Sequence, residues 1–340
     1  MKRVLYIAQA DKDNKLSQTS LEALTAAKQL ADSVSASLAI GLVGENIQEL
    51  AASLSDASSE IAIVDGPEFS SSRYATDAAA LEALVKQTAP SVVVAPATFR
   101  MNRVLPGVAH RAGGHIDTHV NGFSTENKEL IVTRWYYRQR LLAEQTQSKE
   151  PWFLTIDAGL YPAFVPGPGK AAVKTIDVDV DQKWLRTTVK EVKSPAGAAN
   201  TVKPDADLLF VSGAGWTKRQ QDGSTHVDDA TGIIAEFLQK TGASLGSTKS
   251  LVDLSGEGQQ ALPFLTNLNQ VGQTGSTPRH PKGLATACHG EEPHAVGWRF
   301  IKERRAINLD PNCGWAQGKA DVLYIADAFK VMKKVNELLD

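Results

Sequence analysis

The sequence predicts an α/β protein of two domains, with an N-terminal parallel-sheet α/β domain over residues 1–189 and a second α/β domain over residues 205–340. Three observations support this prediction. The first half alternates short β-branched runs with amphipathic stretches, a pattern typical of strands joined by crossover helices. The small, polar run VKSPAGAANTVKP then indicates a linker within residues 190–204. The same alternation restarts after it, and a length of 340 residues favours two domains over one.

The expected strands of the first half are nearly continuous apolar runs, as parallel strands covered by helices on both faces should be. They comprise residues 3–8, 37–43, 60–64 and 91–95. Thr19 and Glu22 form a Thr-x-x-Glu capping box, which predicts the start of the first crossover helix because both side chains can cap free backbone N–H groups. Residues 45–54 and 75–87 are the expected second and third helices.

The pattern changes beyond Gly122, where residues 130–140 and 152–158 have strand character without a full crossover helix between them. We therefore expect a mixed or antiparallel sheet edge there. The second half contains the next set of expected elements. They are strands at 208–212, 285–288 and 305–308, a strand or turn within 244–252, and helices at 230–240 and 327–339.

Charge and composition exclude several classes of protein. The chain has 36 basic and 38 acidic residues, so its net charge of -2 provides no field for nucleic acid or an anionic membrane. No run reaches the roughly 20 apolar residues of a membrane span, and the apolar run near the N-terminus is too short for a signal peptide. The two cysteines, Cys288 and Cys313, form no CxxC pair. A reducing, cytoplasmic location is expected.

Two basic clusters in the first half are interpreted as surfaces. Residues 134–140 combine three arginines with Trp and Tyr, a composition enriched at interfaces, and we expect a domain or subunit interface there. A second cluster lies on an expected helix and loop that could face a partner subunit. It contains Arg100, Arg103, His110, Arg111, His115 and His119.

The polar segment NQVGQTG over residues 269–275 is a candidate ligand-binding loop. Glycines at this spacing let the backbone approach a ligand closely, and Gln and Thr supply neutral hydrogen bonds. A plain turn would have the same composition, so the segment alone identifies no ligand.

The order of several motifs resembles the alpha subunit of electron transfer flavoproteins. The run QVGQTG at residues 270–275 is followed by AINLDP at residues 306–311, and both resemble motifs of that family. Ala320 and Asp321, with Asp327 six residues further on, resemble its ADxxxxxD ending. Residues 20–32 resemble its first helix. The resemblance covers nearly the whole chain.

This resemblance implies that the second domain is a Rossmann-like FAD-binding α/β domain. It also implies a heterodimer with an electron transfer flavoprotein beta subunit that carries AMP. The chain would then be an electron carrier, not a substrate-specific enzyme, between a dehydrogenase and a quinone-reducing or other redox acceptor. The implied FAD contacts are Gly213, Thr248, Lys249, Gln270, Val271, Gly272, Gln273, Thr274, Gly275, His294, Asn308 and Asp327.

The resemblance also implies a role for each group of residues. Residues 270–275 would line the isoalloxazine ring, with the Thr274 hydroxyl near its reactive nitrogen, and Asn308 and Asp327 would hold the adenosine end. Lys249 and His294 would stabilise the negative charge of the reduced flavin and so raise its potential.

The sequence departs from the family pattern at three places. Thr248 and Lys249 stand where the family has Ser-Arg, which keeps the charge but not the planar guanidinium. Gly213, Ala214 and Gly215 replace a Gly-Arg-Gly, so Lys218 or Arg219 is left as a substitute for that arginine. The run CHGEEPH at residues 288–294 replaces GISGAIQH and adds two glutamates.

Other functions stay open. The first, which rests on the altered CHGEEPH run and the missing arginine, is a flavin-depleted structural or nucleotide-binding subunit of a dehydrogenase complex. The second is a flavin-bifurcating complex that uses NADH through its partner. A zinc site formed by cysteine and histidine is a further alternative, although the spacing matches no common zinc pattern. Its ligands would be Cys288, His289, His294 and Cys313.

Overall fold

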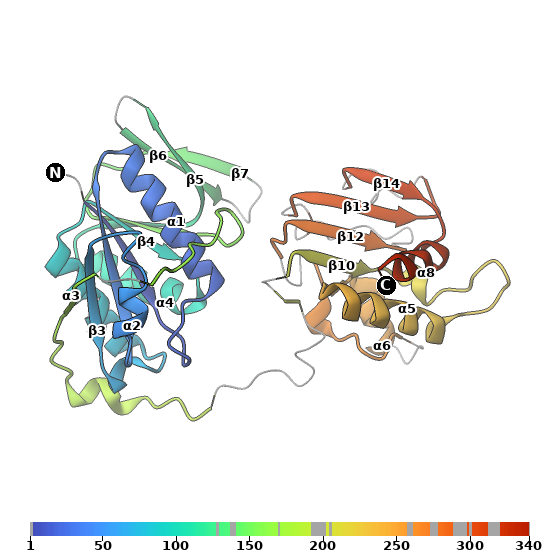
Figure 1. The fold of residues 1–340 in the computed structure, drawn as a ribbon, viewed down its shortest axis with the longest axis horizontal. Coiled ribbons are helices and arrows are strands. Elements are labelled where there is room, and N and C mark those ends of the chain that lie inside the picture. Colours follow the sequence, from blue (N-terminus) through green and yellow to red (C-terminus); the bar gives the residue numbers. More distant parts are fainter. Residues whose placement is uncertain are drawn as a thin grey trace. The chain divides into compact units, whose positions relative to one another are not determined.

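The structure is a computed structural model, and its contacts divide the chain into two units, one within residues 1–192 and one within residues 193–340 (Figure 1). The structure describes residues 3–126, 129–136, 141–168, 171–191, 202–203, 206–256, 261–272, 278–287, 298, 301–311 and 320–339. Within this part of the chain, no helix is long and apolar enough to cross a membrane.

The first unit is built on a mixed sheet with the strand order β7-β6-β5-β8-β4-β1-β2-β3-β9. The strands are β1 (Arg3–Gln9), β2 (Ser37–Gly44), β3 (Glu60–Asp65), β4 (Val92–Pro96), β5 (His115–Glu126), β6 (Glu129–Tyr136), β7 (Leu141–Gln145), β8 (Trp152–Ile156) and β9 (Val173–Thr175). Every neighbouring pair in the part β5-β8-β4-β1-β2-β3-β9 of this order is parallel. Strand β6 is antiparallel to both of its neighbours, β5 and β7. The expected mixed edge is therefore confirmed.

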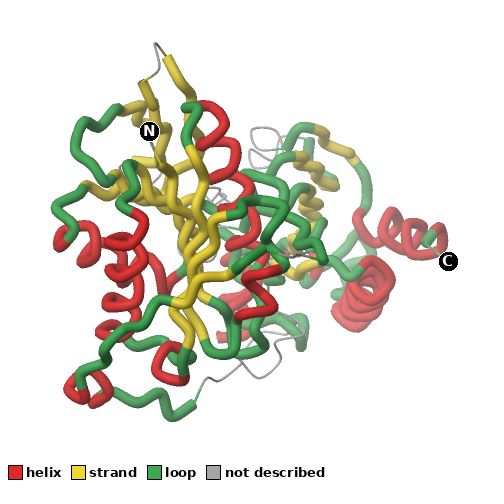
Figure 2. The backbone as a smooth tube through the Cα atoms, turned by 60° about the vertical axis from the view of Figure 1, so that its left-hand side comes forward, coloured by secondary structure: helices red, strands yellow, loops and turns green. Residues whose placement is uncertain are grey.

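Helices cover both faces of this sheet, as the continuous apolar strands predict (Figure 2). One face packs against α1 (Gln18–Ser33) and α2 (Gln48–Ala52), and the other packs against α3 (Tyr74–Thr88) and α4 (Phe99–Arg111). Alternate residues of β1 supply the two cores, since Tyr6 faces the first pair of helices and Ile7 the second.

The predicted cap of the first helix is wrong. Helix α1 begins earlier, at Gln18, and its N-cap is Ser17, whose hydroxyl accepts a hydrogen bond from the backbone N–H of Ser20. Glu22 does not close a capping box. Its carboxylate instead accepts a 2.6 Å hydrogen bond from the backbone N–H of Gly159, which ties the helix to the loop after β8.

The second unit is a parallel sheet with the order β11-β10-β12-β13-β14. Its strands are β10 (Leu208–Ser212), β11 (Ser244–Ser247), β12 (Lys282–Thr286), β13 (Glu303–Asn308) and β14 (Val322–Ile325), and its helices are α5 (Val227–Thr241), α6 (Lys249–Gly256) and α8 (Ala328–Leu338). Helices α5 and α8 pack together on one face, where Phe237 and Met332 join Phe210 in the core. Val271 and Trp298 pack on the other face.

Several elements of this unit differ from the sequence prediction. The segment 244–252 is a short strand followed by a helix, and the strand predicted at 285–288 runs from Lys282 to Thr286. Strand β14 was not predicted, because its side chains at the sheet edge are largely exposed and its pattern is short. Helix α5 begins at Val227, not at residue 230.

Candidate functional site

The second sheet has a change of direction in its strand order next to β10. Strand β11 lies on one side of β10, whereas β12, β13 and β14 lie on the other. Ligands of open parallel sheets bind outside the carboxyl ends of the strands at such a switch point. The carboxyl end of β10 is therefore the place where the fold itself predicts a binding site.

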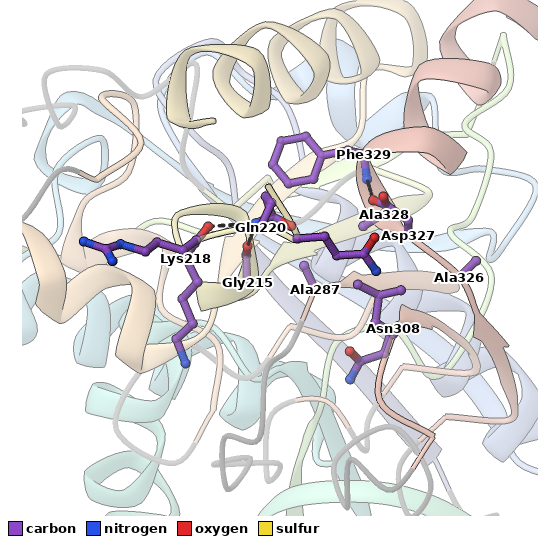
Figure 3. Close-up of a pocket in the computed structure, with 12 residues that line it drawn as sticks. Gly215, Lys218, Gln220, Ala287, Asn308, Ala326, Asp327, Ala328 and Phe329 are labelled. Atoms are coloured by element: carbon purple, nitrogen blue, oxygen red, sulfur yellow. Dashed lines mark hydrogen bonds between the residues drawn. The ribbon is translucent and has the colours of Figure 1, made fainter. Parts of the chain in front are cut away.

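A pocket of about 410 Å³ lies at this edge (Figure 3). It is lined by residues that follow four different strands, as expected when parallel strands end at one edge. The lining residues are Gly215, Lys218, Arg219, Gln220, Gln221, Ala287, Asn308, Leu309, Ala326, Asp327, Ala328 and Phe329. Gly215 and Ala287 lie between Lys218 and Asp327 in the view of Figure 3.

The segment after β10 is held against the end of β12 by several hydrogen bonds. The backbone N–H of Gly213 donates to the carbonyl of Thr286 at 2.9 Å, and that of Gly215 donates to the carbonyl of Ala287 at 2.9 Å. In the same segment, the buried Trp216 indole donates a hydrogen bond to the Thr286 hydroxyl at 2.9 Å. This short loop therefore has a defined position beside β12.

Asn308 and Asp327 lie together on the far side of the pocket (Figure 3). Asn308 is the last residue of β13, and its carbonyl accepts a 3.1 Å hydrogen bond from the backbone N–H of Ala326. Asp327 caps α8, since one carboxylate oxygen accepts a 2.9 Å hydrogen bond from Phe329 N–H. Its other oxygen lies 4.0 Å from Lys330 Nζ. The structure thus brings together two residues that the resemblance assigns to one end of the ligand.

Lys218 and Arg219 bring positive charge to the same pocket. Both are exposed, and neither forms an ion pair with any carboxylate among the residues that the structure describes. These cations lie 89 or more residues before Asn308 in the sequence, so only the sheet topology places them beside it.

A second group of expected ligand residues lies on the other side of β10, at the end of β11. Thr248 donates its backbone N–H to the carbonyl of Ser212 at 3.0 Å, which sets it next to the end of β10. Gln270 forms a one-residue parallel bridge with Ser247, and Val271 N–H donates to the Ser247 carbonyl at 3.0 Å. Gly272 has a φ of 136°, a conformation that favours glycine.

Two side chains of this second group bear on ligand binding. The Thr248 hydroxyl is buried and has no hydrogen-bond partner within the described part of the chain. Buried polar groups rarely lack a partner, so this oxygen fits a group supplied by a ligand. Lys249 is 43% exposed, and its ammonium group pairs with Asp253 one turn along α6.

Asp253 was not singled out from the sequence, although its spacing four residues after Lys249 is the signal that could have found it. Gln273, Thr274, Gly275 and His294 lie outside the described residues, as do all four candidate zinc ligands. No group of three or more potential metal ligands occurs among the described residues.

The residues present fit an extended, anionic dinucleotide. The Thr248 hydroxyl, which is buried and has no partner among the described residues, lies at one side of the end of β10. Two cations, a close glycine backbone and a carboxylate lie at the other side. A large ligand with a polar ring system, phosphates and ribose hydroxyls needs these groups in separate places.

Arg134 and Arg100, one from each basic cluster of the first unit, have partners inside the unit. Arg134 is only 18% exposed, and its guanidinium group contacts the buried Asp117 at 2.5 Å. The Trp152 indole donates to the same carboxylate at 2.8 Å. Arg134 therefore satisfies a buried charge, whereas Tyr136 on the same strand is largely exposed, and the interface expected over residues 134–140 stays a prediction.

Arg100 likewise points inward. Its guanidinium group makes a bidentate contact with the buried Asp77, at 2.9 and 2.5 Å, and also donates to the Phe69 and Ser71 carbonyls. Burial raises the pKa of Asp77, and the hydrogen bond from Arg100 opposes this shift. The expected surface role of Arg100 is therefore wrong.

The structure is a two-unit α/β protein with a pocket at the switch point of its second sheet. The sequence model of the electron transfer flavoprotein domain matches residues 4–181, which lie in the first unit. The chain therefore belongs to the electron transfer flavoprotein family. Its similarity to full-length relatives also extends through the second unit.

Three curated relatives illustrate this. "Electron transfer flavoprotein subunit alpha" of Thermoanaerobacterium thermosaccharolyticum is 26% identical over 96% of this chain and 95% of its own length. The protein of the same name from Methylophilus methylotrophus is 25% identical over 92% and 91%. "Protein FixB" of Clostridium saccharobutylicum is 23% identical over 90% and 87%. The similarity places the chain among the alpha subunits of the family.

Proposed function

We propose that this chain binds FAD in its second unit and carries electrons from a dehydrogenase to a downstream acceptor, such as a quinone-reducing partner. The observation that supports this most directly is the pocket at the switch point of the second sheet, which is lined by Asn308 and Asp327 together with Lys218 and Arg219. When bound, the flavin supplies the electron-transfer chemistry, and the protein sets its position and potential.

Each group of residues has a defined task in this proposal. Asp327 offers a carboxylate oxygen that is not used in capping α8, which suits it to accept hydrogen bonds from ribose hydroxyls. Asn308 offers an amide beside it. At the other side of β10, the Thr248 hydroxyl and the backbone of residues 270–272 would contact the flavin ring.

Lys249 is the residue proposed to favour the reduced cofactor. A cation near the ring stabilises negative charge on it, and the effect is reduced by solvent and by any nearby carboxylate. Because Asp253 pairs with Lys249, its carboxylate weakens the field of the lysine. Lys249 should therefore raise the flavin potential by less than a lysine without a carboxylate partner would.

The proposal includes partners. Relatives of this chain are named as alpha subunits, so we propose a heterodimer with an electron transfer flavoprotein beta subunit, and AMP bound on that subunit. The donor dehydrogenase and the acceptor would bind this heterodimer. The chain is then a carrier whose specificity depends on its protein partners.

The test is the cofactor content of the complex purified with its beta subunit. We expect stoichiometric FAD to be released on denaturation, measured by absorbance and chromatography. Asp327→Asn should lower the FAD content without destabilising α8, because asparagine is an equally good N-cap. A colourless, folded complex that takes up no added FAD would refute the proposal and favour a structural subunit.

A further inference from the structure

Directly after β10 the chain has Gly213, Ala214 and Gly215, and the first cations that follow are Lys218 and Arg219, which line the pocket. We infer that Lys218 and Arg219 bind the phosphate groups of the dinucleotide. This inference rests on the proposed function, and it assigns the positive charge of the pocket to these two residues.

Position supports the assignment. Both residues line the pocket that contains Asn308 and Asp327, and Figure 3 shows Lys218 on the side opposite Asp327. Gly215 and Ala287 lie between these sides in that view. A ligand whose adenosine end lies at Asn308 and Asp327 can therefore extend over Gly215 and Ala287, which have small side chains, so that its phosphate groups come close to the cations.

The backbone that carries the two cations is fixed on both sides. Before them, the indole of the buried Trp216 donates a hydrogen bond to the Thr286 hydroxyl. The same indole packs against the Phe329 ring in a tilted arrangement, with ring centroids 4.6 Å apart. After them, the Gln220 amide donates to the carbonyls of Gly215 and Lys218 at 3.0 and 2.7 Å. Flexible side chains on an ordered turn can adapt to a phosphate without a large loss of backbone entropy.

The charge balance of the pocket also supports it. Among the described residues, the pocket lining contains two cations and one carboxylate, that of Asp327. The next acidic residue along the turn, Asp222, is engaged elsewhere, by the Ser224 N–H at 2.9 Å and the His226 ring at 2.7 Å. An arginine can bind a phosphate through two parallel hydrogen bonds, and a lysine adds a point charge.

The experiment measures FAD affinity of the heterodimer after removal of its flavin, by quenching of flavin fluorescence at several salt concentrations. The variants are Lys218→Gln, Arg219→Gln and the double variant. We expect each single variant to weaken FAD binding by about tenfold, and the double variant by about a hundredfold. The salt dependence of the affinity should become shallower, because fewer charge pairs are screened.

Lys282→Gln is the matched control. Lys282 is also an exposed lysine of the second unit, but it starts β12 and therefore lies at the opposite edge of the sheet. Its replacement should leave affinity and salt dependence unchanged. Thermal unfolding of all variants should match the wild type, since the replaced side chains are exposed.

The outcomes separate this inference from the proposed function. If the wild type binds FAD and the double variant binds it with the same affinity and the same salt dependence, only the inference is overturned. A heterodimer that binds neither FAD nor ADP, tested by calorimetry, overturns both. A heterodimer that binds ADP but not FAD refutes the proposed function. In that case, a loss of ADP affinity in the double variant would still support phosphate binding by Lys218 and Arg219.

Discussion

Gly215 and Ala287 are in direct backbone contact at the base of the pocket. The Gly215 N–H donates to the Ala287 carbonyl at 2.9 Å, and a Cβ added to Gly215 would lie 2.7 Å from that same oxygen. A real Cβ is not found so close to a backbone oxygen. The loop after β10 therefore approaches β12 this closely only because residue 215 is glycine.

Gly215→Ala should consequently weaken FAD binding. The added methyl group pushes the loop away from Ala287 and moves the segment that carries Lys218 and Arg219, so we expect at least a tenfold loss of affinity, on the order of the loss of one charged hydrogen bond. The control is Gly232→Ala within α5, where a Cβ meets no atom within 4 Å. That variant should raise stability by about 0.5–1 kcal/mol and keep FAD affinity.

Thr248→Val separates ligand binding from folding. It keeps the shape of the side chain and removes a buried hydroxyl that has no partner within the described residues, so the stability of the flavin-free protein should stay the same or rise by up to about 1 kcal/mol. FAD affinity should fall several-fold if this hydroxyl contacts the cofactor. Urea unfolding and flavin titration measure the two effects.

Thr286→Val is the matched control for that substitution. The Thr286 hydroxyl donates to the Val211 carbonyl at 3.2 Å and accepts from the Trp216 indole at 2.9 Å. Its loss leaves buried polar groups unpaired, and we expect a destabilisation of about 1–3 kcal/mol. If both variants lower the free energy of unfolding by the same amount, Thr248 is an ordinary structural threonine.

Opposite shifts of potential are expected from Lys249 and Asp253. Lys249→Met removes the cation and should lower the flavin potential, whereas Asp253→Asn removes the carboxylate that pairs with it and should raise the potential. Each shift should be on the order of tens of millivolts, since both groups are partly exposed and screened. Redox titration of the FAD-loaded complex measures them, with Lys282→Met as a control. An unchanged potential in both variants would place the pair away from the flavin.

Arg100→Met should strongly destabilise the first unit. It leaves the fully buried Asp77 without its bidentate partner, which costs about 3 kcal/mol. Arg103 is 41% exposed and 3.7 Å from the same carboxylate, so Arg103→Met should cost less than about 1 kcal/mol. Urea unfolding at neutral pH compares them.

The effect of Arg100→Met should also depend on pH. Burial already raises the pKa of Asp77, and loss of the arginine raises it further. A carboxyl group with a raised pKa in the folded state stabilises the fold at low pH, and this contribution is lost as the pH rises through that pKa. The variant should therefore be closer to the wild type at about pH 5 than at neutral pH. A deficit that is independent of pH would contradict this explanation.

The sequence alone predicted the two α/β units and the mixed sheet edge of the first unit. Continuous apolar runs such as those of β1 and β4 can be satisfied only by burial on both faces, so their pattern determines both the strands and the helical layers. Short or exposed elements gave no such signal. Strand β14 has exposed side chains, and α6 is only eight residues long.

Part of the candidate site could also be predicted from the sequence. Residues 270–275, Asn308 and Asp327 were identified through motif resemblance, and the structure brings Asn308 and Asp327 into one pocket. Lys218 and Arg219 were also named from the resemblance, as substitutes for a missing arginine, but only the tertiary structure puts both of them in one pocket with Asn308 and Asp327. Parallel strands bring their carboxyl ends to one edge of the sheet whatever their separation in sequence. The inward direction of Arg134 and Arg100 was likewise decided by the buried carboxylates of Asp117 and Asp77, since an unpaired charge in the core is too costly to leave without a partner.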